Sequence, residues 1–274
     1  IVSGTSSVAI GAGLRAAENP IHPNPGGYGG CDSAPGSLVA LIDSAGKEDL
    51  KSYPCFKRIS LMQLLDEKGL SWRYYQAVPG AGIWNGPDAV VQIRSNPEYS
   101  TDVITPPSRV LTDIAKGDLA DVVWVTPTAL ASDHPQSNDG SGPSWVAAIV
   151  NAIGESPYWK DTAIFVTWDD WGGWYDHVPP RLLNSYELSF RVPLIVISPY
   201  AKTHYISHVQ HEYGSMLKFA EETFGLPSMH TTDARADDLS DCFDFLQPPT
   251  KFKRIPAKYP ASYFFRQRSW EPND

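Results

Sequence analysis

The stretch "SWVAAIVNAIGESPYWKDTAIFVTWDD", residues 144–170, joins a helical pattern to a short apolar run that ends in two carboxylates. Apolar residues at positions 146, 149, 150 and 153 recur at helical spacing. The run "AIFV" has the length of a strand, and Asp169 and Asp170 follow it closely. We therefore predict a helix followed by a strand, with acidic side chains at the carboxyl end of that strand.

The same alternation of helices and strands extends in both directions. Helical patterns occupy residues 59–69, 108–119 and 211–225, and strand patterns occupy residues 37–46, 70–78, 120–127 and 191–202. This order predicts an α/β fold with a mostly parallel sheet flanked by helices. The unbroken apolar centres "AIFV" and "PLIVI" favour parallel strands that are covered on both faces.

No internal repeat and no linker divide the chain, so we expect a single domain over residues 1–274. Clusters of Gly, Pro and Asn predict an extended surface loop over residues 1–36. By the same signals, residues 79–104 are expected to form a loop-rich insertion and residues 226–274 a loop-rich tail.

Composition excludes some classes of protein. The net charge of −9 argues against a general nucleic-acid-binding protein, which would carry a basic patch. No apolar run approaches the ~18 residues of a transmembrane helix, so we expect no membrane-spanning segment. Nothing in the sequence indicates an oligomeric state.

The three cysteines provide information on the cellular compartment in which the protein resides. Cys31 and Cys55 lie in one loop-rich region, where a disulfide is expected if the protein is exported and two thiols if it is not. Cys242 is left over and is expected to be a buried, small apolar residue. Together with the many proline and aromatic residues, this pattern favours a secreted or periplasmic protein.

Three polar clusters follow predicted strands. "SDHP" contains Asp133 and His134, "WDDWGGWYDH" contains Asp169, Asp170 and His177, and "THYISHVQHE" contains His204, His208 and His211. In open α/β sheets, ligand-binding groups collect at the carboxyl ends of the strands. Because mixed carboxylate and imidazole ligands suit divalent cations, we predict that these clusters share a metal site.

Each candidate also has a simpler explanation. The acidic pair could form a solvated turn, although the glycines at 172 and 173 would let the backbone adopt positive φ or approach a ligand. His134 could be a loop histidine bonded to a carbonyl, and His177 could orient a ligand without binding metal. At least one of the three histidines at 204, 208 and 211 is expected to be only a surface residue.

Several segments together resemble a known family. "TAIFVTWDDWGGWYDHVPP", "FRVPLIVISPYAK" and "YISHVQHEYGSMLKFAEETFGLP" are similar to the bacterial phosphoesterase family of non-specific phospholipases C and related acid phosphatases. "GGCD" and "CFKRISLMQLLDEKGLSWRYY" fit the same pattern in the same order. The family belongs to the alkaline-phosphatase-like superfamily, so the resemblance implies an α/β fold and metal-assisted ester hydrolysis.

The resemblance also implies roles for particular residues. Asp169 and Asp170 match an acidic pair, commonly Asp-Glu, that contributes to binding a divalent metal. His134 matches an active-site histidine that contacts the phosphoryl or leaving group, and His177 matches the histidine of "YDH". Both are expected to be catalytic, and one of the two to assist the leaving oxygen as a general acid. His208 corresponds to a histidine before the following helix, and Asp133 is a further possible site residue.

Two parts of the family pattern are not found between Ile1 and Asp274: an acidic-Asn motif at the metal and a Ser or Thr nucleophile. We therefore expect the chain to correspond to the C-terminal two-thirds of such an enzyme, incomplete at its N-terminus, so that it could be inactive alone. The leading interpretation is a phospholipase C-like hydrolase of phosphate esters or phospholipids. The alternatives are an acid phosphatase on monoesters, a sulfate- or phosphonate-ester hydrolase, and a non-catalytic carbohydrate- or lipid-binding module.

Overall fold

The computed structural model describes residues 1–21 and 29–271. Its strands are β1 (Arg15–Ala16), β2 (Val39–Ile42), β3 (Leu50–Ser52), β4 (Trp72–Tyr75), β5 (Val103–Ile104), β6 (Val122–Val125), β7 (Ile164–Thr167) and β8 (Leu194–Ile197). Its α-helices are α1 (Leu61–Lys68), α2 (Val91–Arg94), α3 (Tyr99–Asp102), α4 (Arg109–Lys116), α5 (Gly142–Gly154), α6 (Tyr213–Phe224) and α7 (Ala261–Phe264). Short 3-10 helices are η1 (Pro87–Ala89), η2 (Ala129–Ala131), η3 (Pro157–Asp161), η4 (Thr232–Ala234) and η5 (Ser240–Cys242).

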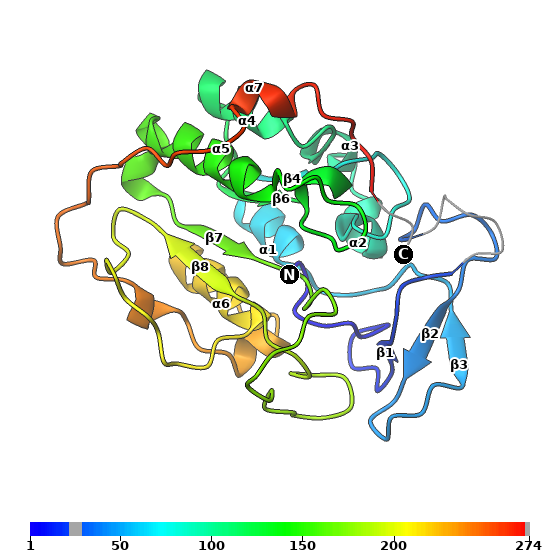
Figure 1. Cartoon of the computed structure of the whole chain (residues 1–274). Helices are drawn as coiled ribbons and strands as arrows, with labels where there is room; N and C mark the ends of the chain where they lie inside the picture. Colours follow the sequence, from blue (N-terminus) through cyan, green and yellow to red (C-terminus); the bar gives the residue numbers. More distant parts are fainter. Residues whose placement is uncertain (22–28, 272–274) are drawn as a thin grey trace.

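A parallel sheet in the order β5-β4-β6 lies at the centre of the fold, with helices on both faces. Side chains of β4 alternate between two cores, with Trp72 and Tyr74 in one and Tyr75 in the other. The first core includes α1 and part of α6, and the second includes α4, α5 and α7, which lie together over one face in Figure 1. The predicted α/β class with a parallel sheet flanked by helices is confirmed.

Local signals explain where the helix between residues 59 and 69 begins and ends. The side chain of Ser60 caps α1 by accepting a hydrogen bond from the main-chain N–H of Gln63 at 3.2 Å. Gly69 ends α1 with φ of 73°, a left-handed conformation that glycine adopts without a steric penalty. These two residues fix the length of α1 and place β4 directly after it.

The strands β7 and β8 differ from our expectation. They pair with each other in antiparallel fashion, so the predicted parallel arrangement of "AIFV" and "PLIVI" is wrong. An unbroken apolar run indicates apolar neighbours on both faces but does not define strand direction. On β7, Ile164 packs with the α4–α5 core, whereas Phe165 packs with Phe219 and Phe243 on the other side.

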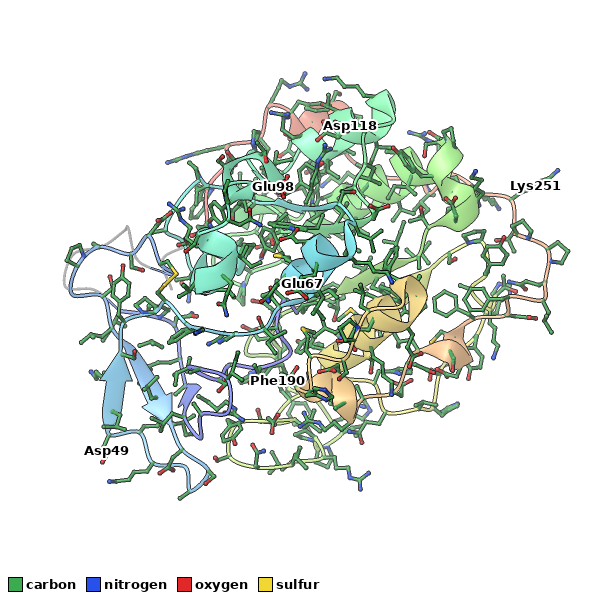
Figure 2. The ribbon with its side chains drawn as sticks, turned by 180° about the vertical axis from the view of Figure 1, so that it is seen from behind. Asp49, Glu67, Glu98, Asp118, Phe190 and Lys251 are labelled. Atoms are coloured by element: carbon green, nitrogen blue, oxygen red, sulfur yellow. A yellow bond between two sulfur atoms is a disulfide. The ribbon has the colours of Figure 1, made fainter. Side chains whose placement is uncertain are left out.

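The N-terminal region forms a separate small sheet. The order is β1-β2-β3 with antiparallel pairing, so the expected surface loop over residues 1–36 contains one short strand. Residues 22–28 of that expected loop lie outside the described residues. The disulfide between Cys31 and Cys55 is present and is drawn in yellow in Figure 2, and Cys242 is free and buried, as predicted.

The two segments expected to be rich in loops contain short ordered elements. Residues 79–104 hold η1, α2 and α3 and end in β5, which extends the parallel sheet. Residues 226–271 hold η4, η5 and α7. Within the described part of the chain, no helix is both long and apolar enough to cross a membrane.

A buried carboxyl group on α6 makes the stability of the fold depend on pH. Glu221 is 4% exposed and accepts a hydrogen bond from the main-chain N–H of Met229 at 3.1 Å. Burial, with a further contribution from the charge of Asp233, raises the pKa of Glu221 from 4.5 to about 7. The folded state therefore holds this proton more tightly than the unfolded state does.

We expect Glu221→Gln to stabilise the protein at pH 8 and to change little at pH 4. The stability that comes from the protonated carboxyl is fully present below the unfolded pKa and is lost as pH rises from about 4.5 to about 7. The lost stability is at most about 3 kcal/mol, because each pKa unit corresponds to about 1.4 kcal/mol. Urea unfolding of the variant and the wild type at the two pH values measures this difference in the free energy of unfolding. An equal change at both pH values would contradict the explanation.

Candidate active site

Loops that follow β6, β7 and β8 line one open cavity of about 1670 Å³. Six residues singled out from the sequence are among its lining: Asp133, His134, Asp169, Asp170, His177 and His208. Residues 1–6 at the start of the chain line it as well. The structure thus brings the three polar clusters to one cavity, although β7 and β8 are antiparallel.

The acidic pair sits in a turn directly after β7. Asp170 Oδ1 accepts a hydrogen bond from the main-chain N–H of Gly172 at 2.6 Å, and Gly172 and Gly173 have φ of 61° and 75°. Both carboxylates are accessible to water within the cavity. The surrounding protein nevertheless reduces the hydration of Asp169 and raises its pKa, the nearby Asp170 raises it further, and His134 partly offsets this effect.

Asp169 lies in the wall of the cavity, which accounts for both observations. Its side chain is accessible to water from the cavity, while the surrounding protein reduces its hydration. For chemistry the accessible surface matters more, because a cation or substrate in the cavity can reach the carboxylate. Reduced hydration is the main cause of the raised pKa, and the charge of Asp170 adds to it; a bound cation would relieve that repulsion between the two carboxylates.

Tyr213, the first residue of α6, holds the backbone at the acidic pair. Its hydroxyl lies 2.7 Å from the carbonyl oxygen of Trp168 and 2.8 Å from that of Asp169, and it shares its hydrogen bond between them. Burial, followed by the charges of Asp169 and Asp170, raises the pKa of Tyr213, so the hydroxyl keeps its proton. Sequence analysis missed this residue, because a tyrosine at the start of a helix carries no signal of its distant partner.

We expect Tyr213→Phe to lower turnover by about 5- to 10-fold, the effect of one lost hydrogen bond that positions a reacting group. The Michaelis constant should change little, because the hydroxyl contacts the protein backbone. Tyr186→Phe is the matched control, since Tyr186 lines the same cavity and the substitution keeps the ring that packs under Arg15. Equal turnover in the Tyr213 variant and the wild type would exclude a positioning role.

His134 is half-buried at the wall of the cavity. Its main-chain N–H donates to Ser132 Oγ at 3.1 Å, and its Nδ1 lies 3.4 Å from Ser137 Oγ. The ring of Trp84 packs against it, with centroids 6.4 Å apart and planes inclined by 50°. Trp84 comes from the segment expected to be an insertion, so its contact with the site could not be read from the sequence.

The remaining candidates differ in their surroundings. Asp133 has φ of 65°, and a Cβ placed on Gly142 would lie 2.2 Å from its Oδ1, so its carboxylate lies against the start of α5. The side chain of His177 is 84% exposed, with Nδ1 3.8 Å from Asp176. His208 is exposed and lines the cavity.

Cationic side chains also line the cavity, and our sequence analysis did not identify them. They are Arg15, Arg58, Arg181, Arg191, Lys202 and Arg235. Arg58 donates to the carbonyl oxygens of Ser6 and Ser7, the former at 3.0 Å. Burial, together with the charge of Arg15, lowers the pKa of Arg58 to about 10. Acidic side chains line the cavity too, and Arg191 and Arg235 are paired with some of them, so the lining carries charges of both signs.

The donor set at the acidic pair is compatible with a metal ion. Adjacent carboxylates offer oxygen ligands to a hard divalent cation, whose remaining ligands are commonly water or substrate. Among the described residues, one group of three potential ligands lies close together. The ligand atoms of His211, Asp241 and Cys242 are all within 4.8 Å of one another. The expected close set of Asp169, Asp170 and His134 is therefore not formed at that distance, although all three line the cavity.

The chain has an α/β fold in which loops after three strands line one cavity. The model of the phosphoesterase family matches residues 36–227, and the chain belongs to this family. The resemblance inferred from the sequence is thereby confirmed.

Curated relatives carry the name phospholipase C. The chain is 29% identical over 230 residues to phospholipase C B of Mycobacterium tuberculosis (strain ATCC 25618 / H37Rv), which covers 69% of the chain and 44% of that protein. It is 25% identical over 293 residues to non-hemolytic phospholipase C of Burkholderia pseudomallei, covering 84% and 41%. For non-specific phospholipase C1 of Arabidopsis thaliana the identity is 25% over 249 residues, covering 78% and 44%. The chain thus spans less than half the length of these relatives.

Proposed function

We propose that the protein is a phosphoric-ester hydrolase of the phospholipase C type. The observation that carries the proposal is the convergence of Asp169, Asp170 and His134 on one cavity that also contains several cationic side chains. The names of the relatives point to the same reaction class.

In this proposal each residue has a distinct role. Asp169 and Asp170 hold a divalent cation, which when bound neutralises the phosphoryl oxygens and supports nucleophilic attack. The hydrogen bonds from Tyr213 and Gly172 keep the two acids in place. His134 donates a proton to the leaving oxygen, and the nucleophile is not assigned to a residue of this chain.

Aromatic side chains at the cavity favour a phospholipid over a small phosphate monoester. Trp171, Trp174 and Tyr175 follow the acidic pair and are 50%, 73% and 90% exposed. Indole and phenol rings suit the boundary between lipid headgroups and acyl chains, where one end of the ring is apolar and the other is hydrated. An acid phosphatase would need no such surface.

Assays of the protein as its gene encodes it, with three substrates, test the proposal: phosphatidylcholine vesicles, p-nitrophenyl phosphorylcholine and p-nitrophenyl phosphate, each with and without a chelator. We expect hydrolysis of both diesters, loss of activity with the chelator, and slow hydrolysis of the monoester. Preference for the monoester would identify an acid phosphatase instead. Retention of vesicles without turnover, and without dependence on divalent metal, would identify a lipid-binding module.

The disulfide supports the proposed location. Disulfides persist in oxidising compartments, and Cys31–Cys55 closes a loop with a sequence separation of 24. We therefore propose that the protein is secreted or periplasmic, where a phospholipid surface is accessible to it. Alkaline phosphatase fusions in the native host would report export, and an exclusively cytoplasmic signal would contradict the assignment.

A further inference from the structure

A second cluster of potential metal ligands lies where the segment after β8 meets the segment that contains η5. Main-chain hydrogen bonds join these two segments, which lie side by side (Figure 1). The Nε2 of His211 lies 3.7 Å from Asp241 Oδ1 and 4.0 Å from Cys242 Sγ. The thiol and the carboxylate oxygen are 3.6 Å apart. One imidazole nitrogen, one carboxylate oxygen and one sulfur thus form a small triangle.

The dimensions of this triangle suit a tetrahedral cation. With bonds of about 2.0 Å to nitrogen and oxygen and about 2.3 Å to sulfur, the ligand atoms of tetrahedral zinc are about 3.3–3.6 Å apart. The separations in the cluster exceed these values by a few tenths of an ångström, which small side-chain rotations can close. A thiol and an imidazole favour zinc-like cations over calcium or magnesium, which prefer oxygen ligands.

The side chains around the triangle are themselves held in place. His211 Nδ1 lies 2.7 Å from Asp237 Oδ1, which also accepts a hydrogen bond from Ser215 Oγ at 2.7 Å. The second oxygen of Asp237 accepts from the main-chain N–H of Leu239 at 2.9 Å. A carboxylate on the far nitrogen of a histidine fixes its tautomer and ring orientation, as it does for histidines that bind zinc.

The carboxylate of Asp241 is also oriented. Its Oδ2 accepts hydrogen bonds from Ser207 Oγ at 2.6 Å and from Tyr205 at 3.0 Å, so Oδ1 is directed toward the imidazole and the thiol. Ser207 Oγ lies 2.8 Å from His211 Nε2, which places a hydroxyl beside the imidazole of the cluster. Ser207, His211 and Cys242 line the large cavity, so the cluster is reachable from it.

The same side chains include a serine, a histidine and an aspartate in the order of a hydrolytic triad: Ser207, His211 and Asp237. Asp241 argues against that interpretation, because its carboxylate lies 2.6 Å from the serine oxygen. A nucleophilic serine needs surroundings that stabilise developing negative charge, and a carboxylate at this distance opposes it. The same carboxylate favours binding of a cation.

We propose that His211, Asp241 and Cys242 bind a zinc-like divalent cation at a site separate from the acidic pair of Asp169 and Asp170. Ser207 or a water molecule occupies the fourth position. The cation ties the segment after β8 to η5 and thereby fixes one wall of the cavity.

Cobalt substitution provides a test with a unique signature. Cys242 is the one free thiol of the chain, because Cys31 and Cys55 form the disulfide. Titration of the metal-free protein with Co²⁺ should therefore give a thiolate-to-cobalt charge-transfer band and the intense visible absorption of tetrahedral cobalt, and Zn²⁺ should displace both. Zn²⁺ should also slow the reaction of Cys242 with a thiol reagent by more than 10-fold.

Matched variants complete the test. Cys242→Ser should abolish the charge-transfer band, and Asp237→Asn should weaken Co²⁺ binding by about 10- to 100-fold, the usual effect of losing a carboxylate behind a metal-bound histidine. Asp170→Asn is the control and should leave the thiolate-to-cobalt charge-transfer band unchanged, which separates this site from the proposed catalytic one. Absence of the sulfur band in the folded wild type would overturn the proposal, as would covalent labelling of Ser207 by a fluorophosphonate.

Discussion

Asp170→Asn should lower phosphodiester turnover by about 10³-fold or more, which corresponds to about 4 kcal/mol of transition-state stabilisation. The asparagine keeps an oxygen for the hydrogen bond from Gly172, so the turn after β7 stays intact. What changes is the charge: one of two adjacent carboxylates that face the cavity becomes neutral. The measurement is kcat/KM on p-nitrophenyl phosphorylcholine, together with the divalent metal content of the purified protein.

The control for this variant comes from the same loop. Asp176 also lines the cavity, but both of its oxygens are paired with Arg191, at 2.7 and 2.8 Å. Because exposed ion pairs contribute little, Asp176→Asn should keep turnover within a few-fold of the wild type. If Asp170→Asn retained normal turnover and normal metal content, the acidic pair would have no part in catalysis.

The sequence predicted the fold class because local signals were strong. Helical spacing, the cap of Ser60 and the stop at Gly69 are properties of adjacent residues, and they defined α1 and β4 correctly. The relative direction of β7 and β8 could not be predicted from such signals, because it depends on which strands pair in three dimensions. An apolar run contains no information about that pairing.

The same distinction applies to the cavity. Asp169, Asp170 and His134 were found because they follow strand patterns, and the structure places them at one cavity. Tyr213 was missed because its partner carbonyl lies 44 residues away along the chain. The cluster of His211, Asp241 and Cys242 was missed for the same reason, since it joins two segments about 30 residues apart.

His134→Gln should lower turnover of phosphatidylcholine by about 10²- to 10⁴-fold, the usual contribution of a positioned general acid. The leaving group of this lipid is an alkoxide, which must receive a proton as the bond to phosphorus breaks. The leaving group of p-nitrophenyl phosphorylcholine is a stable phenolate that needs no such proton, so the same variant should lose less than about 10-fold on that substrate. The comparison of the two substrates therefore reports proton donation directly.

His208→Gln is the matched control, because His208 lines the same cavity but is exposed. The His208→Gln variant should lose little activity, and by the same small factor on both substrates. If His134→Gln reduced the turnover of both substrates by the same factor, the imidazole would act by binding the phosphoryl group. A cation held beside Asp169 would then be the better candidate for assisting the leaving oxygen. A loss confined to the alkyl substrate, with circular dichroism and thermal stability unchanged, would assign proton donation to His134.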